Sequence, residues 1–290
     1  MPSHKLFDRL APVLFVLIWS TGWIVPQYSS GDADPLIFLC VRFVLAGALL
    51  SAFALASGAP FPAGRERMDA VVSGVLLHGF YLCCVWWAVA QGVPSTLSAL
   101  LATVQPILTA LAAPKLLGER LTPMKALGVA LGFAGLLITL SPKLLGAQGL
   151  SAPLFPLLVN AFGMVSITAG AMFQRKHLAG GDLRAIASLQ YLGALCVSVP
   201  AALLFAAPRF ALTIPVIGAL VWSVLALSVG AIALLLLLIR HGEASRAATL
   251  LYLVPPTAAA QAALLFGERL SLAQIFGFGV AIVGVVMARR

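Results

Sequence analysis

Ten apolar runs, each long enough to cross a bilayer, follow one another along the chain with only short breaks between them. A helix that crosses roughly 30 Å of hydrocarbon needs about 20 predominantly apolar residues. Runs of this kind cover residues 10–28, 35–57, 69–91, 95–117, 122–141, 150–173, 184–207, 214–239, 245–266 and 271–288. The breaks carry the turn and charge signals that end helices. The sequence therefore predicts an all-α integral membrane protein with ten transmembrane helices and no soluble domain.

The composition favours lipid over water as the surrounding medium. Of the 290 residues, 61% are hydrophobic and only 9% are charged, whereas a soluble domain carries roughly 25% charged residues. A surface that faces lipid needs no charged coat. The net charge of +9 comes from basic residues in short loops, without a basic–aromatic patch, so we expect membrane lipid around the protein and no nucleic-acid partner.

The loop charges also predict the orientation of the chain. Of the 18 Lys and Arg residues, fourteen belong to one side, and only Lys143, Arg209 and Arg269 belong to the other. Arg42 lies inside an apolar run. Because loops rich in Lys and Arg stay in the cytoplasm, we expect a multi-pass protein with both termini cytoplasmic.

An internal repeat divides the chain into halves. The tetrapeptide Gly-Glu-Arg-Leu at 118–121 recurs at 267–270, an offset of 149 residues. The same offset aligns Pro106 with Pro255, Gly128 with Gly277 and Gly135 with Gly284. We expect a first five-helix repeat over 1–149 and a second over 150–290. Five is an odd number, so equivalent helices should cross in opposite directions around a central cavity, a common plan of secondary transporters.

The sequence resembles a known family at this point. The ten runs, the doubled proline–GER–glycine pattern and the segment Ile18-Trp19-Ser20-Thr21-Gly22-Trp23 are similar to the EamA-type branch of the drug/metabolite transporter superfamily. The resemblance covers essentially the whole chain and is greatest to bacterial inner-membrane exporters of aromatic amino acids. It implies location in the bacterial inner membrane, with the runs 122–141 and 271–288 bracing the outside of the bundle.

Polar and aromatic side chains at membrane depth are the candidate substrate-binding residues, because lipid disfavours a polar group that faces it. His78 and Tyr81 lie three residues apart, which predicts a shared helical face. The alternative for His78 is a neutral histidine bonded to a neighbouring helix. The full set is Trp19, Ser20, Trp23, His78, Tyr81, Trp86, Ser98, Gln105, Asn160 and Tyr252. For each of these, packing between helices is the competing interpretation.

Two prolines are predicted to break helices at equivalent places in the two halves. Pro106 follows Gln105 at the middle of its run, and Pro255 lies at the corresponding depth of the second half. A pair of broken helices is the best sequence indicator of a transporter's binding site, although both can be structural kinks. Arg42 either reaches the outer surface, or attracts an anionic group such as a carboxylate; we favour a structural role.

Several functions are disfavoured by what the sequence lacks. All nine acidic residues lie in loops or at helix ends, which argues against proton-coupled export of lipophilic cations and against a carboxylate-based sodium site. The chain has no H-E-x-x-H, G-x-S-x-G or Walker motif, so we expect neither an enzyme nor a metal or other cofactor. The four cysteines lie inside apolar runs and are expected to be small core residues.

The predicted function is therefore export of a small neutral or zwitterionic solute by alternating access. An aromatic or large apolar amino acid fits the aromatic side chains, with the protein acting as a monomer or weak homodimer. The alternatives are export of another metabolite or drug, or lipid flipping, which should show a lateral opening between helices.

Overall fold

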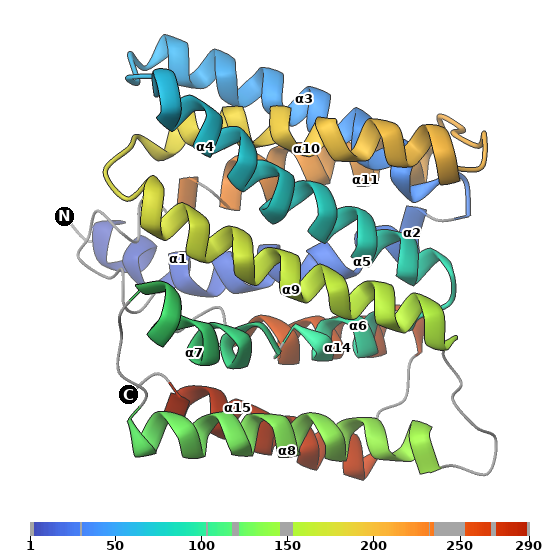
Figure 1. The fold of residues 1–290 in the computed structure, drawn as a ribbon. Helices are drawn as coiled ribbons and strands as arrows, with labels where there is room; N and C mark the ends of the chain where they lie inside the picture. The colour runs from blue at the N-terminus through green and yellow to red at the C-terminus, as the bar shows by residue number, and fades with distance from the viewer. Residues whose placement is uncertain are drawn as a thin grey trace.

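The protein is built from helices that run roughly alongside one another (Figure 1). This computed structural model describes residues 3–29, 31–102, 104–117, 122–145, 153–231, 233–234, 253–267 and 271–288. Within those ranges the only β-pairing is an isolated bridge between Ala33 and Phe210. The first half contains α1 (Ser3–Ser20), η1 (Thr21–Trp23), α2 (Val25–Ser29), α3 (Pro35–Ala56), α4 (Gly64–Gly74), η2 (Val75–Phe80), α5 (Tyr81–Ala90), α6 (Ser95–Leu101), α7 (Val104–Leu117) and α8 (Pro123–Leu145). The second contains α9 (Leu154–His177), α10 (Leu183–Phe205), α11 (Ile214–Trp222), η3 (Ser223–Gly230), α14 (Val254–Phe266) and α15 (Leu272–Ala288).

Helices lie in every predicted apolar run, but not every run is one continuous helix. Four stretches are long and apolar enough to span a membrane by themselves: Pro35–Ala56, Gly64–Ala90, Leu154–His177 and Leu183–Phe205. Shorter apolar helices occupy the other runs, and part of the run 245–266 lies outside the described residues. The all-α class is confirmed, whereas ten membrane crossings and inverted halves stay predictions.

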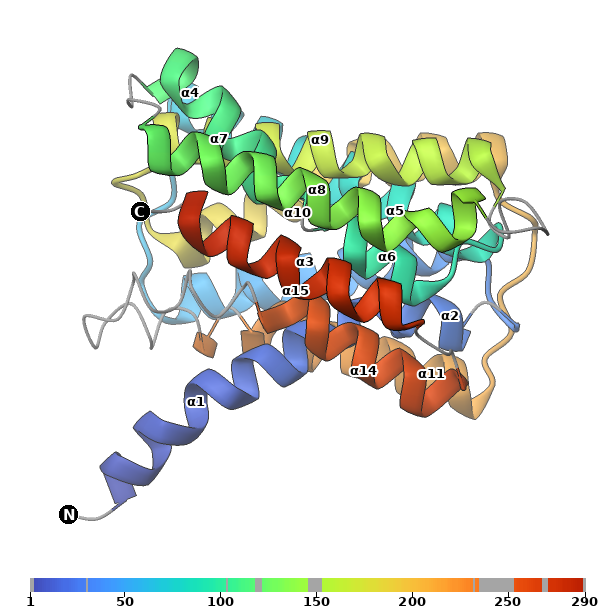
Figure 2. The ribbon, with the colours of Figure 1, turned by 90° about the horizontal axis from the view of Figure 1, so that it is seen from below.

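The outer surface is apolar to a degree that suits lipid. Ile214 is 88% exposed, Leu264 85% and Leu203 82%. In water, a contiguous surface of this kind would drive association, but in hydrocarbon it carries no such penalty. Figure 2 shows that α1 projects away from the other helices toward its N-terminal end.

The equivalent helices α3 and α10 pack against each other in opposite directions. Asp34 caps the start of α3 by accepting from the backbone N–H of Leu36 at 2.9 Å. The same carboxylate accepts from the N–H of Ala207, just beyond the end of α10, also at 2.9 Å. At the far end of the pair, Ala54 of α3 and Ala185 of α10 share one buried cluster. The two helices are therefore antiparallel.

The start of α10 is held by a local ion pair. Asp182 caps the helix and accepts two hydrogen bonds from the Arg184 side chain, at 3.0 and 2.6 Å. The donation from Arg184 holds the pKa of the Asp182 carboxyl below its ordinary value. The carboxylate therefore caps the helix across the neutral pH range, and this contribution is lost as the pH falls through the depressed pKa.

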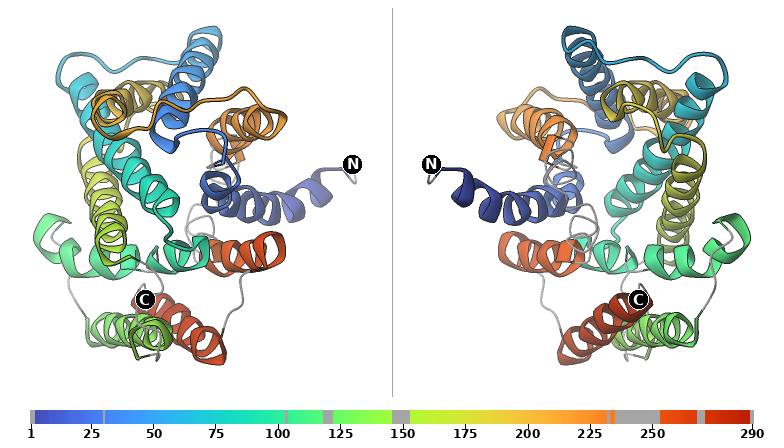
Figure 3. Two further views of the ribbon diagram at one scale, coloured as in Figure 1. Left: turned by 90° about the vertical axis from the view of Figure 1, so that its right-hand side faces the viewer. Right: turned by 90° about the vertical axis from the view of Figure 1, so that its left-hand side faces the viewer.

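Glycine permits the close contact of α8 and α15, which lie together beside the other helices (Figure 3). A Cβ on Gly284 would overlap the backbone of Gly132 and Gly128. A Cβ on Gly277 would overlap the backbone of Gly135 and Thr139. The contacts thus move toward the start of α8 as they move toward the end of α15, so these two helices are also antiparallel. Small residues on both helices therefore form this contact.

Two π-helical segments occupy equivalent places in the halves. Segment η2 covers Val75–Phe80, and the 149-residue offset carries this range to 224–229, inside η3 (Ser223–Gly230). In a π-helical turn the backbone hydrogen bond joins residues five apart in sequence, one more than in an α-helix. Such turns are frequent at functional sites. Both segments were expected to be ordinary α-helix, because a π-turn leaves no mark in hydropathy.

The glycine contact predicts a position-specific effect on stability. Gly284→Ala should lower the free energy of unfolding by about 1–3 kcal/mol, because its Cβ meets backbone that cannot move aside. Gly279→Ala on the same helix is the matched control, since a Cβ there meets nothing within 4 Å. Thermal unfolding of both purified variants in detergent measures the difference. Equal melting temperatures would show that the close contact is not required.

Candidate functional site

The helix that contains Pro106 is interrupted just before that residue. Pro106 has no N–H to donate to the carbonyl of Ala102, one turn earlier. That carbonyl instead accepts from the N–H of Gln105 at 3.1 Å, and α6 ends at Leu101 while α7 begins at Val104. The backbone at the break is thus satisfied within the protein, as an apolar medium requires.

The corresponding helix of the second half begins with prolines. The first turn of α14 contains Val254, Pro255 and Pro256, and Tyr252 lies outside the described residues. Leu101, at the end of α6, and Val254 belong to one buried cluster. The Ser20 hydroxyl lies within hydrogen-bond distance of two carbonyls, those of Val16 at 2.6 Å and Val254 at 3.3 Å. Ser20 therefore ties α1 to the start of α14, beside the break in the first half.

A group of aromatic rings lies where α3, η2, α5 and α10 meet. His78 of η2 stacks face to face on Tyr191 of α10, with ring centroids 5.1 Å apart and planes 7° apart. Tyr81 instead meets Trp23 of η1 edge-on at 6.3 Å. The ring partners of His78 and Tyr81 thus lie on different helices. That His78 and Tyr81 share one helical face stays a prediction, and the π-helical segment η2 alters the angular spacing on which it relied.

Arg42 joins this aromatic group from α3. Its guanidinium carbon lies 5.6 Å from the ring centroid of Trp86, and Nη2 lies 3.5 Å from the Ser228 hydroxyl on η3. Arg42 is 6% exposed and Trp86 is fully buried. The phenol groups of Tyr81 and Tyr191 lie close enough to the guanidinium to interact with it. The Arg42 head group is therefore inside the bundle and does not reach the outer surface.

The contacts of Arg42 and Tyr191 are related by the sequence repeat. The 149-residue offset carries Arg42 to Tyr191, and it carries Gly79, the neighbour of His78, to Ser228. The Arg42–Ser228 contact and the Tyr191–His78 stack thus occupy equivalent places to within one residue. Each joins a helix of one half to the π-helical segment of the other. The sequence analysis favoured a structural role for Arg42, and its set of candidates contained neither Tyr191 nor Ser228, although the offset links Arg42 to Tyr191.

Asn160 and Ser98 form a second polar pair. The Asn160 amide Nδ2 donates to the Ser98 hydroxyl at 2.6 Å, and both side chains are fully buried. This bond joins α9 to α6, on the N-terminal side of the break before Pro106. It is not part of the aromatic group around His78.

The remaining candidates occupy more peripheral positions. Trp19 packs on Phe15 at 5.1 Å and is partly buried against the main core. Gln105 is half-buried, and its carbonyl accepts from the hydroxyl of Thr109. Neither has a described contact that links it to His78 or Arg42.

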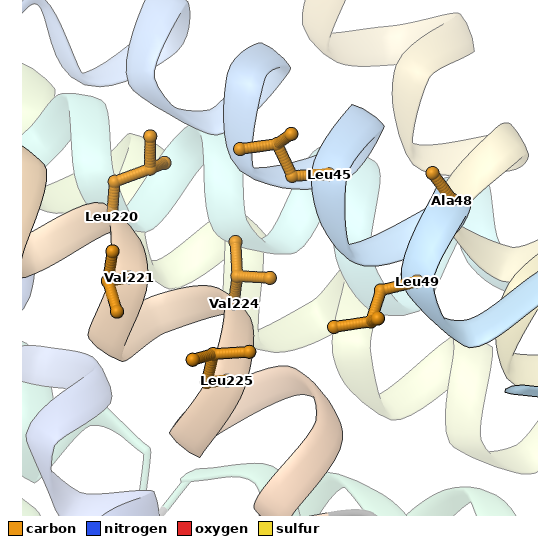
Figure 4. Close-up of a pocket in the computed structure, with 7 residues that line it drawn as sticks. All are labelled: Leu45, Ala48, Leu49, Leu220, Val221, Val224 and Leu225. Carbon is orange, nitrogen blue, oxygen red and sulfur yellow. The ribbon is translucent and has the colours of Figure 1, made fainter. Parts of the chain in front are cut away.

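An apolar hollow opens between α3 and the α11–η3 segment (Figure 4). Its volume is about 520 Å³, and it is lined by Leu45, Ala48, Leu49, Leu220, Val221, Val224 and Leu225. Arg42 lies three residues before Leu45, and its partner Ser228 lies four residues after Val224. The same two elements thus carry the apolar hollow and the buried polar contact beside it.

Groups of three or more His, Cys, Asp or Glu side chains that could hold a metal ion are absent from the described part of the chain. The cysteines are free, but Cys196 is exposed on α10 rather than buried, which corrects the expectation that all four are core residues. A cysteine side chain is apolar enough to face lipid, so hydropathy alone does not distinguish a buried cysteine from a lipid-facing one.

Interrupted apolar helices around buried polar and aromatic side chains are the arrangement expected of a membrane transporter for small solutes. The chain belongs to the EamA-like transporter family, which matches residues 10–141 and 154–290. The family resemblance expected from the sequence is confirmed, and the protein is a multi-pass membrane transporter.

Three relatives of low identity are named as transport proteins. The inner membrane transporter YedA of Escherichia coli is 28% identical over 97% of this chain and 92% of its own. An Escherichia coli protein named a probable amino-acid metabolite efflux pump is 24% identical over 96% of this chain and 93% of its own. The aromatic amino acid exporter YddG of Ancylobacter novellus is 28% identical over 44% of each chain. A solved crystal structure shares the fold, with a TM-score of 0.65 and 20% identity over 96% of this chain and 95% of that one.

The Asn160–Ser98 pair predicts a measurable coupling. In a double-mutant cycle with Asn160→Ala and Ser98→Ala, the coupling energy should be about 1 kcal/mol, because either single change removes the same buried bond. Unfolding in mixed micelles measures the four free energies. A cycle of Asn160→Ala with Ser188→Ala, whose hydroxyl bonds within its own helix, should show no coupling. Coupling that is equal in the two cycles would contradict a direct bond.

Proposed function

We propose that the protein exports a small neutral or zwitterionic solute, an aromatic or large apolar amino acid, across the bacterial inner membrane. The supporting observation is the group formed by His78, Tyr81, Trp86, Tyr191 and Arg42 at the meeting of helices from both halves. Aromatic faces receive an apolar side chain, while phenol, indole and guanidinium groups meet the polar end. The names of two relatives, an amino-acid metabolite efflux pump and an aromatic amino acid exporter, point to the same substrates.

Alternating access by two inverted halves, 1–149 and 150–290, is the mechanism that we propose. The antiparallel pairs α3–α10 and α8–α15 support it, because each joins helices that the repeat makes equivalent. The exchanged contacts of Arg42 and Tyr191 support it as well. In this scheme the ten helices place both termini in the cytoplasm, and the halves rock about the site between them.

A second candidate, transport of a lipid or another lipophilic solute, is favoured by one observation. The hollow between α3 and α11–η3 is open and has an entirely apolar lining, as a lateral entrance from the membrane would have. The buried guanidinium beside it favours a solute with a polar end over a plain hydrocarbon.

Counterflow in proteoliposomes tests the substrate class. Vesicles preloaded with unlabelled phenylalanine should take up labelled phenylalanine transiently above its equilibrium level, as a carrier does and a channel does not. Empty vesicles and vesicles loaded with glucose are the controls. Exchange of a labelled lipid or amine, with none for any amino acid, would overturn the assignment in favour of the second candidate.

Two substitutions at His78 separate a role as a wall of the site from a role in proton coupling. His78→Phe keeps a flat ring against Tyr191, whereas His78→Ala removes the stack. If His78 acts as a wall of the site, counterflow should fall by about three- to tenfold in His78→Ala and stay near wild type in His78→Phe. A large loss in both variants, together with a loss of the pH dependence of transport, would instead assign proton coupling to the imidazole.

A further inference from the structure

Arg42 is a buried cation without an anionic partner among the residues that the structure describes. It lies seven residues beyond Pro35, about 10 Å along α3 from the start of the helix. No carboxylate of the described residues lies within ion-pair distance of it. Asp34, at the start of the same helix, already accepts from the N–H groups of Leu36 and Ala207. A buried charge is normally paired, so this arginine needs an explanation.

Two hydrogen-bond donors at this place lack an acceptor. Among the side chains that the structure describes, Nε of Arg42 and Nε1 of Trp86 are buried and have no hydrogen-bond partner. The two residues are in direct cation–π contact at 5.6 Å. That contact compensates part of the charge but occupies neither N–H group. The contact with Ser228 at 3.5 Å is long for a hydrogen bond.

The groups around Arg42 are also suited to donate hydrogen bonds. The phenol groups of Tyr81 and Tyr191 lie near the guanidinium and each carries an O–H, whereas the Ser228 hydroxyl already donates to the carbonyl of Ser223 at 3.0 Å. A cluster of donors around one fixed positive charge fits a singly charged, planar acceptor. The carboxylate is such a group, and the guanidinium fork matches its two oxygens.

We propose that Arg42 and Trp86 bind the carboxylate of the transported solute. This inference rests on the proposed function and adds the group by which the substrate is recognised. The apolar part of the same solute would lie on the neighbouring rings of Trp23, Tyr81 and Tyr191. The site therefore selects aryl and alkyl carboxylates, amino acids included, over the matching amides, amines and esters.

A matched pair of ligands tests the proposal by binding alone. Phenylacetate and phenylacetamide differ only in the acidic group, and each is titrated against the rise in melting temperature of the purified protein in detergent. The wild type should prefer the acid by about tenfold or more, as hydrogen bonds to a charged group confer. Arg42→Gln should lose this preference while its affinity for the amide stays unchanged. A preference retained in Arg42→Gln, or an equal loss for both ligands, would overturn the assignment.

Further variants keep the test decisive if Arg42→Gln does not fold. Trp86→Phe keeps a ring under Arg42 but lacks the N–H, so its preference for the acid should fall severalfold. Arg42→Lys keeps the charge without the planar guanidinium, so its preference for the acid should lie between those of the wild type and of Arg42→Gln. Arg65→Gln, at an exposed arginine of α4, removes an equal charge elsewhere and should leave the preference for the acid unchanged. A Trp86→Phe variant with full preference for the acid would contradict the paired donors.

The binding test and the counterflow test can give independent outcomes. If no amino acid exchanges, but phenylacetate is preferred by the wild type and not by Arg42→Gln, the carboxylate site stands and the amino-acid assignment falls. If phenylalanine exchanges while neither protein distinguishes acid from amide, the transport assignment stands and the role of Arg42 is structural.

Discussion

Hydrocarbon supplies no hydrogen-bonding partner, so every interruption of a membrane helix must be satisfied inside the protein. This constraint explains where the irregular backbone lies. The break before Pro106, the turn η1 and the π-helical segment η3 contribute residues to the buried core or pack against it. The π-helical segment η2 packs against α10. The uninterrupted helices α8 and α15 form a separate glycine-rich pair at the side of the bundle. Irregular backbone and polar side chains are thus concentrated where the two halves meet.

Local chemistry was enough to predict part of this architecture. Hydropathy located the apolar runs, because a lipid-facing surface is a property of each segment alone. The missing N–H of Pro106 indicated a break. The repeated glycines did not identify the helix that each one contacts, and the pairing of α8 with α15 is seen only in the structure. The first GER segment lies outside the described residues, whereas Gly267 ends α14 with a positive φ of 65°, as expected for a glycine at a helix terminus.

The candidate site depended on contacts that no local pattern contains. Arg42 and Ser228 are 186 residues apart, and the stack of His78 on Tyr191 joins η2 to α10. Asn160 was singled out by its depth alone, but its partner Ser98 is set by the packing of α9 on α6. Such pairings follow from tertiary packing, which overrides the periodicity of any single helix.

The loops at one end of α3 and α10 exchange backbone as well as side-chain hydrogen bonds. Asp34 donates to the carbonyl of Arg209 at 2.7 Å through its N–H, and the carbonyl of Asp32 accepts from Ala211 at 2.9 Å. These bonds join residues that precede α3 to residues that follow α10. A chain cut in the linker between α8 and α9 would leave each fragment with peptide groups whose hydrogen-bond partners belong to the other fragment. Separately synthesised fragments would consequently have to assemble with one another before either could reach its folded state.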